Sequence, residues 1–523
     1  MKTNHVSSDT LLKEFSKRKT QAPLLFIFLS SSSQGGPSEL RKEMGKRQRD
    51  DLPPWWSEVV GELRSQGGYL HPSVCFSANS RELSVYSLIQ SDTLLMKLPR
   101  RCLLTPERAM ELSPWLAVLT ETVKAKELYT PTSDLIIAMA MASQRPETLP
   151  YLKTLPDPDS FDSLPRRWAE SKIDELLRGS PLLNRARAAK EGVCKDYDAI
   201  KEAWNKTQEQ KCAFPSFQEF SNMLAAVSSR AFGFGDSDEG VVMIPILDLC
   251  DHSRGRNHQK NLAYKRLQDG SVEVRSIVEI KQHELLRLTY GARGNSQLLL
   301  NYGFSIARNW EPDGSSNDVL EFSLNGEDMV NLRAGPKSYS YGPLVKALEQ
   351  ACTVEPYGSS CETPGMDDME AFLDECEESE EIDIIYGNTP DCGTENESGD
   401  TEEIQRELEG FKVLRDGFRQ RIEAYGFKGK KLQEEISSAK ASHSYFAAIL
   451  AQSELRTLHF YVRAIEKIEA FMQNQAPQDP NSVDLNIDDD DLDLLETQTE
   501  ELAEAFMKIR HADLMQEPNN QPR

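Results

Sequence analysis

Residues Val241 to Arg308 read VVMIPILDLCDHSRGRNHQKNLAYKRLQDGSVEVRSIVEIKQHELLRLTYGARGNSQLLLNYGFSIAR, and this stretch decides the fold. Its apolar start, 241–249, predicts a strand that stops at the polar turn beginning with Asp251 and His252. Two further strand-like runs, 262–267 and 272–277, are separated by an Asp-Gly turn. The stretch therefore predicts several short strands that end in polar turns.

Two tyrosines in this stretch directly precede glycines. Alternation places Leu286, Leu288 and Tyr290 on one face of a strand, and Tyr302 follows a short helix predicted at 295–300. With the Asp-His turn, these tyrosines suggest a pocket built at sheet edges. The alternative is that both tyrosines lie at the edge of the core with their hydroxyls hydrogen-bonded to the backbone. A tyrosine commonly packs its ring in the core and keeps its hydroxyl in a polar environment.

Further out, the stretch reads IPILDLCDHS at 244–253, HE at 283–284, YG at 290–291, N at 295, LL at 298–299 and YGF at 302–304. In this order and with these gaps, it resembles the C-terminal half of a SET domain, in the subgroup similar to Rubisco large-subunit lysine methyltransferases. That subgroup has roughly I-P-x-x-D-x-x-N-H-S, then G-E-x-x-x-x-x-Y-G-x-x-S-N-x-x-L-L-x-x-Y-G-F. The sequence departs at Asp251, where the family has Asn, and at His283, where Gly is usual.

The resemblance implies an α+β fold, with a SET-domain core of small β-sheets, an inserted helical block and an α-helical C-terminal domain. We expect a SET domain at 51–325 with a helical insert at about 106–235, and a helical substrate-binding-like domain at 335–475. Amphipathic spacing independently predicts helices near 411–425 and 455–472. We expect disorder or a transit-like segment at 1–50, an acidic insert at about 355–405, and an acidic disordered tail at 476–523. A stretch of that tail, 502–509, is amphipathic and is a candidate docking helix.

By resemblance, the function is that of a protein-lysine N-methyltransferase that transfers a methyl group from S-adenosylmethionine to a lysine of a non-histone protein. An aromatic wall at Phe232 favours the aliphatic stem of lysine over an imidazole. Tyr290 matches the catalytic tyrosine of the family. The residues implied at the cofactor are Leu95, Asp251, His252, Tyr290 and Tyr302. The residues implied in the substrate channel are Arg230, Phe232 and Tyr302.

Two other functions remain open from the sequence. A catalytically inactive SET-fold scaffold is one, because the family's G-x-G-L-x-A is replaced here by SRELSVY at 80–86, without glycine, and because Asp251 replaces Asn. A protein-histidine methyltransferase is the other. Single residues also have plainer interpretations: His252 as a hydrogen-bonded core histidine, and Arg230 as a surface salt bridge at a helix end. The basic cluster at 254–260 is either a solvated loop or a steering patch.

Composition limits the classes of partner. The chain has 523 residues and a net charge of −24, which argues against a nucleic-acid binder. The charge would favour a basic protein substrate, and plain solvation is the alternative explanation. No apolar run reaches the length of a membrane span, so we expect no membrane partner. The nine cysteines include no C-x-x-C pair, which predicts no metal site and fits a reducing compartment. We expect a monomer in the cytoplasm or nucleus, with the plastid as the alternative.

Overall fold

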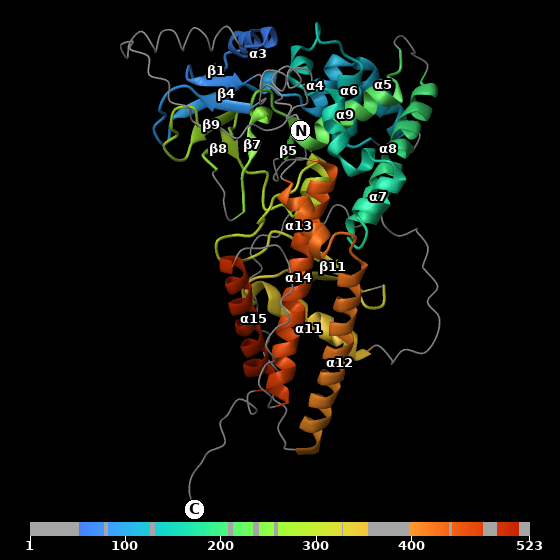
Figure 1. Ribbon diagram of the computed structural model, residues 1–523. Coiled ribbons are helices and arrows are strands. Elements are labelled where there is room, and N and C mark those ends of the chain that lie inside the picture. Colours follow the sequence, from blue (N-terminus) through green and yellow to red (C-terminus); the bar gives the residue numbers. More distant parts are fainter. Residues whose placement is uncertain are drawn as a thin grey trace, which may run out of the picture.

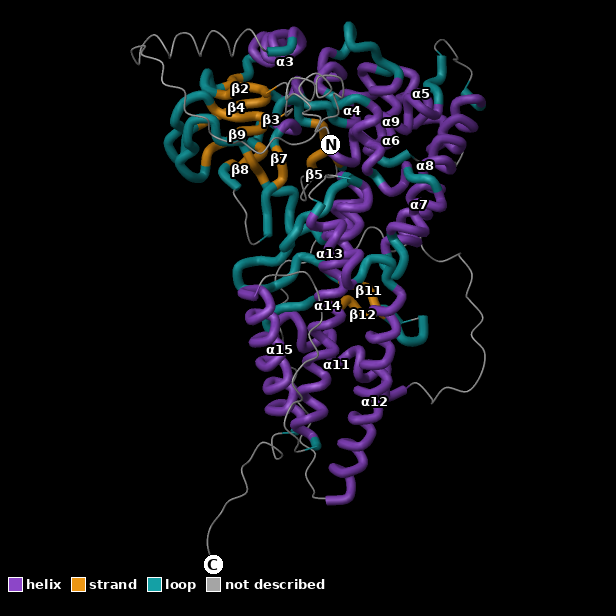
Figure 2. The backbone as a smooth tube through the Cα atoms, viewed as in Figure 1, coloured by secondary structure: helices purple, strands orange, loops and turns teal. Residues whose placement is uncertain are grey.

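The computed structural model describes residues 52–77, 82–125, 131–207, 213–233, 240–255, 260–326, 328–353, 397–438, 442–473 and 489–511. Small sheets and a group of helices lie side by side at one end of an elongated molecule, and a long helical body extends from them (Figures 1 and 2). The expectations for 1–50, for 355–396 and for Arg256 and His258 fall outside the described residues.

An antiparallel four-stranded sheet, in the order β1-β4-β9-β8, forms the centre of the first part. The strands predicted at 262–267 and 272–277 are confirmed as β8 and β9. In β9, Val272 and Val274 are fully buried while the alternating residues Glu273 and Arg275 are partly exposed, as expected for a strand with one face on the core. The strands are β1 (Tyr69–Leu70), β4 (Leu94–Leu98), β8 (Leu262–Arg266) and β9 (Val272–Ser276).

Three two-stranded sheets surround this centre. Strand β10 pairs in parallel with β7, so that Arg287 lies opposite Asp251 and Leu288 opposite His252. Strand β3 is joined to the segment before β10 by the N–H of Leu286, which donates to the carbonyl oxygen of Leu83 at 2.8 Å. The strands are β2 (Val74–Ser77), β3 (Glu82–Val85), β5 (Ala231–Gly233), β6 (Val241–Met243), β7 (Asp251–His252) and β10 (Arg287–Leu288).

The strand predicted at 241–249 is wrong beyond Met243. Pro245 has no N–H to give to a ladder, and Ile246 adopts φ +74° and ψ −47°, after which a 3-10 turn, η6, spans Leu247–Leu249. A positive φ is rare for a β-branched residue. The side chain of Ile246 is nevertheless buried, so packing holds this turn in place.

Helices of the insert form a second core beside the sheets. Helix α9 begins with a capping box, in which Ser216 and Glu219 satisfy each other's backbone N–H, and it ends at Arg230 immediately before β5. Helix α3 (Pro54–Ser65) packs outside the insert, against the sheets. The insert comprises α4 (Pro106–Leu112), α5 (Pro114–Ala125), α6 (Ser133–Ala142), α7 (Glu170–Leu176), α8 (Leu182–Asn205) and α9 (Phe217–Arg230), with 3-10 turns η3 (Pro150–Thr154), η4 (Pro158–Ser163) and η5 (Pro165–Arg167).

The helical body is organised around α14, which is buried along most of its length. The helices predicted near 411–425 and 455–472 lie within α12 and α14. The hairpin of β11 and β12 shares this core, since Leu320 and Phe322 pack with Phe418, so the boundary expected at 325 lies too late in the chain. Its elements are α10 (Asn295–Tyr302), β11 (Leu320–Phe322), β12 (Val330–Leu332), α11 (Lys337–Thr353), α12 (Glu397–Ala424), α13 (Gly429–Ser437), α14 (His443–Met472) and α15 (Asp489–Arg510).

The disordered tail predicted at 476–523 is wrong for residues 489–511, because α15 packs against the helical body. Leu495, Leu502 and Phe506 recur at spacings of seven and four and are buried on one face. The acidic residues of the same segment mostly face away from that core, so a high charge did not prevent docking. The predicted acidic insert is likewise helical from Glu397 onward.

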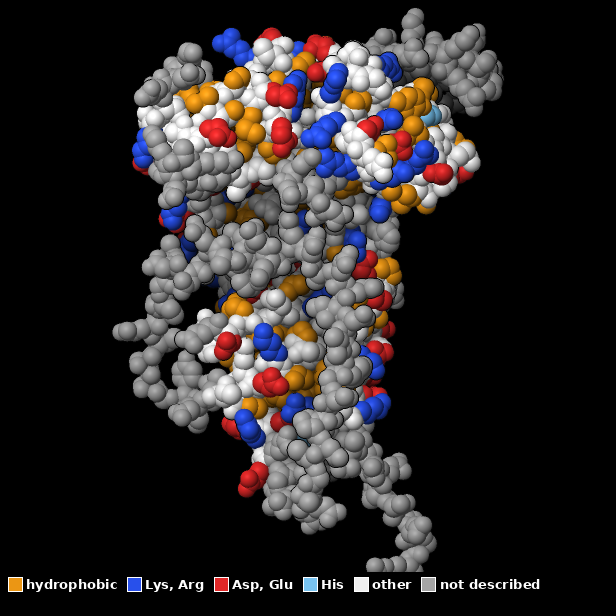
Figure 3. Space-filling model, turned by 180° about the vertical axis from the view of Figure 1, so that it is seen from behind, with side chains coloured by type: hydrophobic (Ala, Val, Ile, Leu, Met, Phe, Trp, Pro, Cys, Tyr) orange, Lys and Arg blue, Asp and Glu red, His pale blue; other side chains and the backbone are white. Residues whose placement is uncertain are grey.

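Seen from behind, the described surface carries Lys and Arg side chains interspersed with Asp and Glu (Figure 3). Within the described residues, no helix is both long enough and apolar enough to cross a membrane.

Candidate active site

Tyr290 lies just after β10 and is held at three points. Its N–H donates to Nδ1 of His252 at 2.8 Å, and its hydroxyl donates to the carbonyl oxygen of Cys250 at 3.1 Å. Its ring is stacked on that of Tyr302, with centroids 5.0 Å apart. The structure thus brings together three predicted residues, Tyr290, His252 and Tyr302. Burial raises the pKa of the Tyr290 phenol, which therefore stays protonated at neutral pH.

His252 is neutral in this arrangement. Its Nδ1 accepts the Tyr290 N–H, so the ring proton resides on Nε2. Burial, aided by the positive charge of Arg254, lowers the pKa of His252 to about 4. The Nε2 atom is buried and has no hydrogen-bond partner among the described residues. The interpretation of His252 as a fully satisfied core histidine is therefore incomplete, because one donor remains available.

An aromatic wall continues from Tyr302. Phe304 lies 6.1 Å from Tyr302 and 6.3 Å from His252, measured between ring centroids. Gly303 makes this possible: it ends α10 with φ +80°, and a Cβ there would come within 2.1 Å of the Ser163 hydroxyl. The turn at Gly303 therefore lets both neighbouring rings face the same region.

Phe232 joins the wall through a residue that sequence reasoning missed, Tyr264 of β8. The two rings meet edge to face at 5.4 Å, and the Tyr264 phenol has a raised pKa, through burial and then through the nearby Tyr302. The sequence did contain one indication of Tyr264: it is an aromatic residue in the strand predicted at 262–267, which follows the Asp-His turn. Phe232 itself is 8% exposed and belongs to the sheet core.

Arg230 was predicted at the channel mouth, but its guanidinium is committed to Asp248. It donates to the Asp248 carbonyl oxygen at 2.8 Å and lies 3.5 Å from the carboxylate. The Tyr151 hydroxyl donates to the same carboxylate at 2.7 Å. Burial raises the pKa of Asp248, and Arg230 opposes this shift. Arg230 thus forms a helix-end salt bridge that is buried rather than exposed, and it braces the turn before β7.

Asp251, predicted at the cofactor, is exposed to solvent. Glu82, a residue that sequence reasoning missed, lies near the carboxyl group of Asp251 and acts on it electrostatically. Burial raises the pKa of Asp251 to about 7, and Glu82 adds to this rise. The positive charges of Arg287 and Arg230 oppose it.

Leu95 does not join this group. Its side chain is fully buried in the sheet core, and its carbonyl oxygen accepts the His71 N–H at 2.8 Å. The backbone contact to a cofactor that the resemblance implied at Leu95 stays a prediction; β4 uses that carbonyl to hold the segment after β1.

Comparison with known proteins identifies the architecture. The chain superposes on the SET domain of LSMT bound to lysine and AdoHcy with a TM-score of 0.55 and 16% identity, covering 81% of this chain and 93% of that one. Rubisco LSMT bound to AdoMet gives a TM-score of 0.54 at 16% identity, covering 81% of this chain and 94% of that structure. The chain has the SET-domain fold of Rubisco LSMT.

Sequence relatives are more distant and partial. An actin-histidine N-methyltransferase of Danio rerio is 24% identical over 232 residues, 42% of this chain and 37% of the relative. SET domain-containing protein 4 of Homo sapiens is 24% identical over 288 residues, 52% of this chain and 62% of the relative. The chain therefore spans less than two thirds of either protein. No protein-family model matches the chain.

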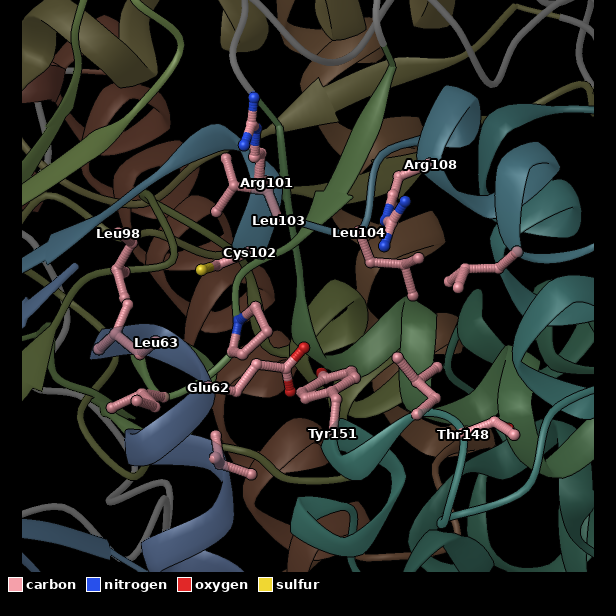
Figure 4. A pocket seen from close by; sticks show the side chains of 15 residues that line it. Glu62, Leu63, Leu98, Arg101, Cys102, Leu103, Leu104, Arg108, Thr148 and Tyr151 are labelled. Atoms are coloured by element: carbon pink, nitrogen blue, oxygen red, sulfur yellow. The ribbon is translucent and has the colours of Figure 1, made fainter. Parts of the chain in front are cut away.

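In this SET fold, one cavity lies beside Tyr151, whose hydroxyl donates to Asp248. It has a volume of about 80 Å³ and is lined mainly by α3, the segment 101–104, α4, the segment 148–151 and the turn at Ile246 (Figure 4). Tyr151 is at its wall and Glu62 points toward it (Figure 4). None of the aromatic residues around Tyr290 lines this cavity, so it is separate from the candidate active site.

The SET fold is tied to the helical body at Asn295. The side-chain oxygen of Asn295 accepts the Ile306 N–H at 2.7 Å, while its amide nitrogen donates to the Ile306 carbonyl at 3.1 Å and to Ser453 of α14 at 3.1 Å. This accounts for the asparagine of the motif: it closes the loop that follows Tyr302 and anchors it to the buried face of α14.

The residues of this SET fold fit S-adenosylmethionine. The site holds a buried N–H donor at His252 that has no partner among the described residues, and two carboxyl groups, Asp251 and Glu82, that suit a cationic amine. The family's glycines are absent at 80–86, which raised doubt about the cofactor site. This segment instead supplies Glu82, which lies near Asp251. In the part of the chain that is described, no group of three or more His, Cys, Asp or Glu side chains could hold a metal ion.

Proposed function

We propose that this chain is a protein methyltransferase that transfers a methyl group from S-adenosylmethionine to a lysine side chain of a protein. The observation that carries the proposal is the placement of the Tyr290 phenol within an aromatic wall of Phe232, Tyr264 and Tyr302, near the acidic group of Asp251. This combination supplies an apolar passage for an amine and a polar site for the cofactor.

The aromatic wall acts on the incoming side chain. A lysine reacts as the neutral amine, and an apolar passage disfavours its charged form and so lowers its pKa. Aromatic rings also pack well against the methylene stem of lysine, and they restrict its orientation. The wall therefore selects and aligns the nucleophile, which matters because methyl transfer requires an in-line approach.

Tyr290 acts as an oxygen acceptor rather than as a base. Its proton is engaged with the Cys250 carbonyl, which leaves the lone pairs of the hydroxyl oxygen for weak C–H···O contacts. S-adenosylmethionine, when bound, supplies a methyl group made electrophilic by its sulfonium. Because Nδ1 of His252 is occupied by the Tyr290 N–H, that histidine does not take the lysine proton either.

Histidine is the second candidate target, because the actin-histidine N-methyltransferases are among the sequence relatives. The lysine assignment rests on Phe232, whose benzyl group offers no hydrogen bond to an imidazole nitrogen. An amide at this position would provide one.

Two measurements test the proposal. Titration calorimetry with S-adenosylmethionine is expected to show saturable binding, and its absence at millimolar cofactor would refute the function. Incubation of a cell extract with labelled cofactor, followed by mass spectrometry of the modified peptides, is expected to place the label on lysine. Label on histidine would show that the methylated side chain is histidine rather than lysine. Absence of label despite cofactor binding would favour a catalytically inactive scaffold.

A further inference from the structure

Segment 304–317 runs from the candidate active site to the start of α15. At one end of the segment, the Phe304 ring faces Tyr302 and His252, with centroids 6.1 and 6.3 Å away. A few residues later, the Arg308 guanidinium lies 2.6 Å from the carboxylate of Asp491 in the first turn of α15. The Asp491 side chain is 1% exposed, so this ion pair is shielded from water on the side of α15. A ring of the site and a contact with α15 therefore belong to the same short piece of chain.

Helix α15 holds this segment at two further points. The Asp491 carboxylate accepts the indole N–H of Trp310 at 3.3 Å, and the Arg456 guanidinium of α14 lies over the Trp310 ring at 4.5 Å. Farther along α15, the side-chain amide of Gln498 donates to the carbonyl oxygen of Asp313 at 2.6 Å. Because the contacts include the backbone as well as buried side chains, α15 restrains the path of the whole segment.

Hydrogen bonds connect the restrained segment to the backbone of Tyr290. Asn309, the neighbour of Arg308, donates its side-chain N–H to the carbonyl oxygen of Arg293 at 3.0 Å. Arg293 in turn donates through Nε to the carbonyl oxygen of Tyr290 at 3.2 Å. A shift of the chain at Arg308 would therefore pull on the residue that carries the phenol of the site.

The same segment also packs against the backbone that follows His252. Arg254 donates through Nε to the carboxylate of Glu311 at 2.9 Å. A Cβ added at Gly255, which has φ +82°, would lie 2.8 Å from the carbonyl oxygen of Arg308, so the two backbones are in close contact. The segment is thus wedged between α15 and the two turns that carry His252 and Tyr290.

Building on the proposed function, we propose that Asp491 and Arg308 are positioning residues of the methyltransferase: their ion pair fixes segment 304–317, and thereby the aromatic wall that aligns the target side chain. Neither residue touches the reacting atoms. A misplacement of about 1 Å at a reacting centre can cost about 10²-fold in rate, so release of the start of α15 slows methyl transfer. Cofactor binding survives this release, because α15 takes no part in the pairing of β7 with β10.

The test compares Asp491→Ala with Glu407→Ala in the full chain. Glu407 is buried in α12 and is paired with Arg510 at 2.7 Å and with His511 at 2.5 Å. Its replacement therefore breaks a buried ion pair of the same helix, but at the end opposite Asp491. Label transfer from S-adenosylmethionine to the proteins of a cell extract gives the maximal rate, and titration calorimetry gives the Kd of the cofactor and the fraction of chains that bind it.

Asp491→Ala is expected to lower the maximal rate at least about tenfold, with the Kd and the binding fraction unchanged. Glu407→Ala should keep the maximal rate within about twofold of the wild type, because its contact is distant from the segment. A general loss of folded chains would lower the binding fraction and the rate together, so it is distinguished from misalignment.

Arg308→Ala should reproduce the slow rate of Asp491→Ala, and the double variant should be no slower than either single variant, since the two side chains act through one contact. Hydrogen exchange of the amides of 304–311 should be faster in Asp491→Ala than in Glu407→Ala.

A wild-type rate in Asp491→Ala, or an equal loss of rate in Asp491→Ala and Glu407→Ala, would overturn the inference and leave the proposed function standing. Loss of cofactor binding in Asp491→Ala would overturn it as well, because alignment of the target would then not be the affected step. A wild-type chain that neither binds the cofactor nor transfers label would refute the proposed function, and with it this inference.

Discussion

The hydroxyl of Tyr290 donates to the carbonyl oxygen of Cys250, 40 residues earlier in the chain, at 3.1 Å. This bond aims the phenol oxygen and uses its only proton. The ring, the backbone N–H and the hydroxyl of Tyr290 are each fixed by a different neighbour, so a change confined to the hydroxyl should affect chemistry far more than folding.

Replacement of Tyr290 by Phe is expected to lower the rate of methyl transfer about 10²-fold or more, since a preorganised oxygen at the reacting centre is lost. Stability should fall by only about 1 kcal/mol, the net value of one hydrogen bond. Labelled-methyl incorporation and the Tm of both proteins measure the two effects. Tyr86→Phe, at an exposed tyrosine, is the control; an active Tyr290→Phe enzyme would contradict the assigned role.

His252 should make stability depend on pH. Its pKa is lowered to about 4 in the folded chain from 6.5, so the unfolded chain binds more protons between these values. Its contribution is complete above about pH 6.5 and is lost as the pH falls toward 4. Between pH 7.5 and 5, the wild type should lose about 1–2 kcal/mol more stability than His252→Asn.

The Asn variant keeps an acceptor for the Tyr290 N–H but does not titrate. Denaturant unfolding at both pH values measures the difference, and His283→Asn, at an exposed histidine, should track the wild type. Equal pH dependence of the wild type and His252→Asn would show that His252 is not the titrating group.

Asp491 should determine whether the start of α15 stays docked. Its carboxylate is buried, lies 2.6 Å from the Arg308 guanidinium and accepts from the Trp310 indole at 3.3 Å. Asp491→Ala removes one partner of a buried ion pair, which typically costs about 3 kcal/mol. Faster hydrogen exchange of the α15 amides is the expected readout. Exchange as slow as in the control Asp493→Ala, at an exposed position, would argue against this contact.

Phe506 should contribute most of the apolar docking energy of α15. Its ring is fully buried and meets Phe411 of α12 edge to face at 5.2 Å. Phe506→Ala is expected to destabilise the helical body by about 3–4 kcal/mol, as typical for a buried aromatic side chain. Ile509→Ala in the same helix, 64% exposed, should change stability by less than about 0.5 kcal/mol. Similar unfolding midpoints for the two variants would contradict the docked arrangement.

Local sequence patterns were sufficient to predict the structure where residues that are neighbours in the sequence are also neighbours in space. The alternation in 272–276 and the turn at Gly270 predicted β8 and β9, and the motif around Tyr290 and Tyr302 predicted two residues that are in ring contact. Charge density misled at the C-terminus, because the acidic residues of α15 mostly face away from the core while Leu502 and Phe506 pack inward. Composition averages over these two faces and does not separate them.

The sequence by itself predicted the SET-type fold and the tyrosine at the centre of the candidate site through its resemblance to a known family, because the motif residues stand at short, regular gaps. Periodicity predicted individual strands and helices. Only the tertiary structure decided which distant groups complete the site. Tyr151 reaches Asp248 across 97 residues, and Glu82 meets Asp251 through a shared strand neighbour. Such contacts arise from how strands and helices pack, and no local pattern records them.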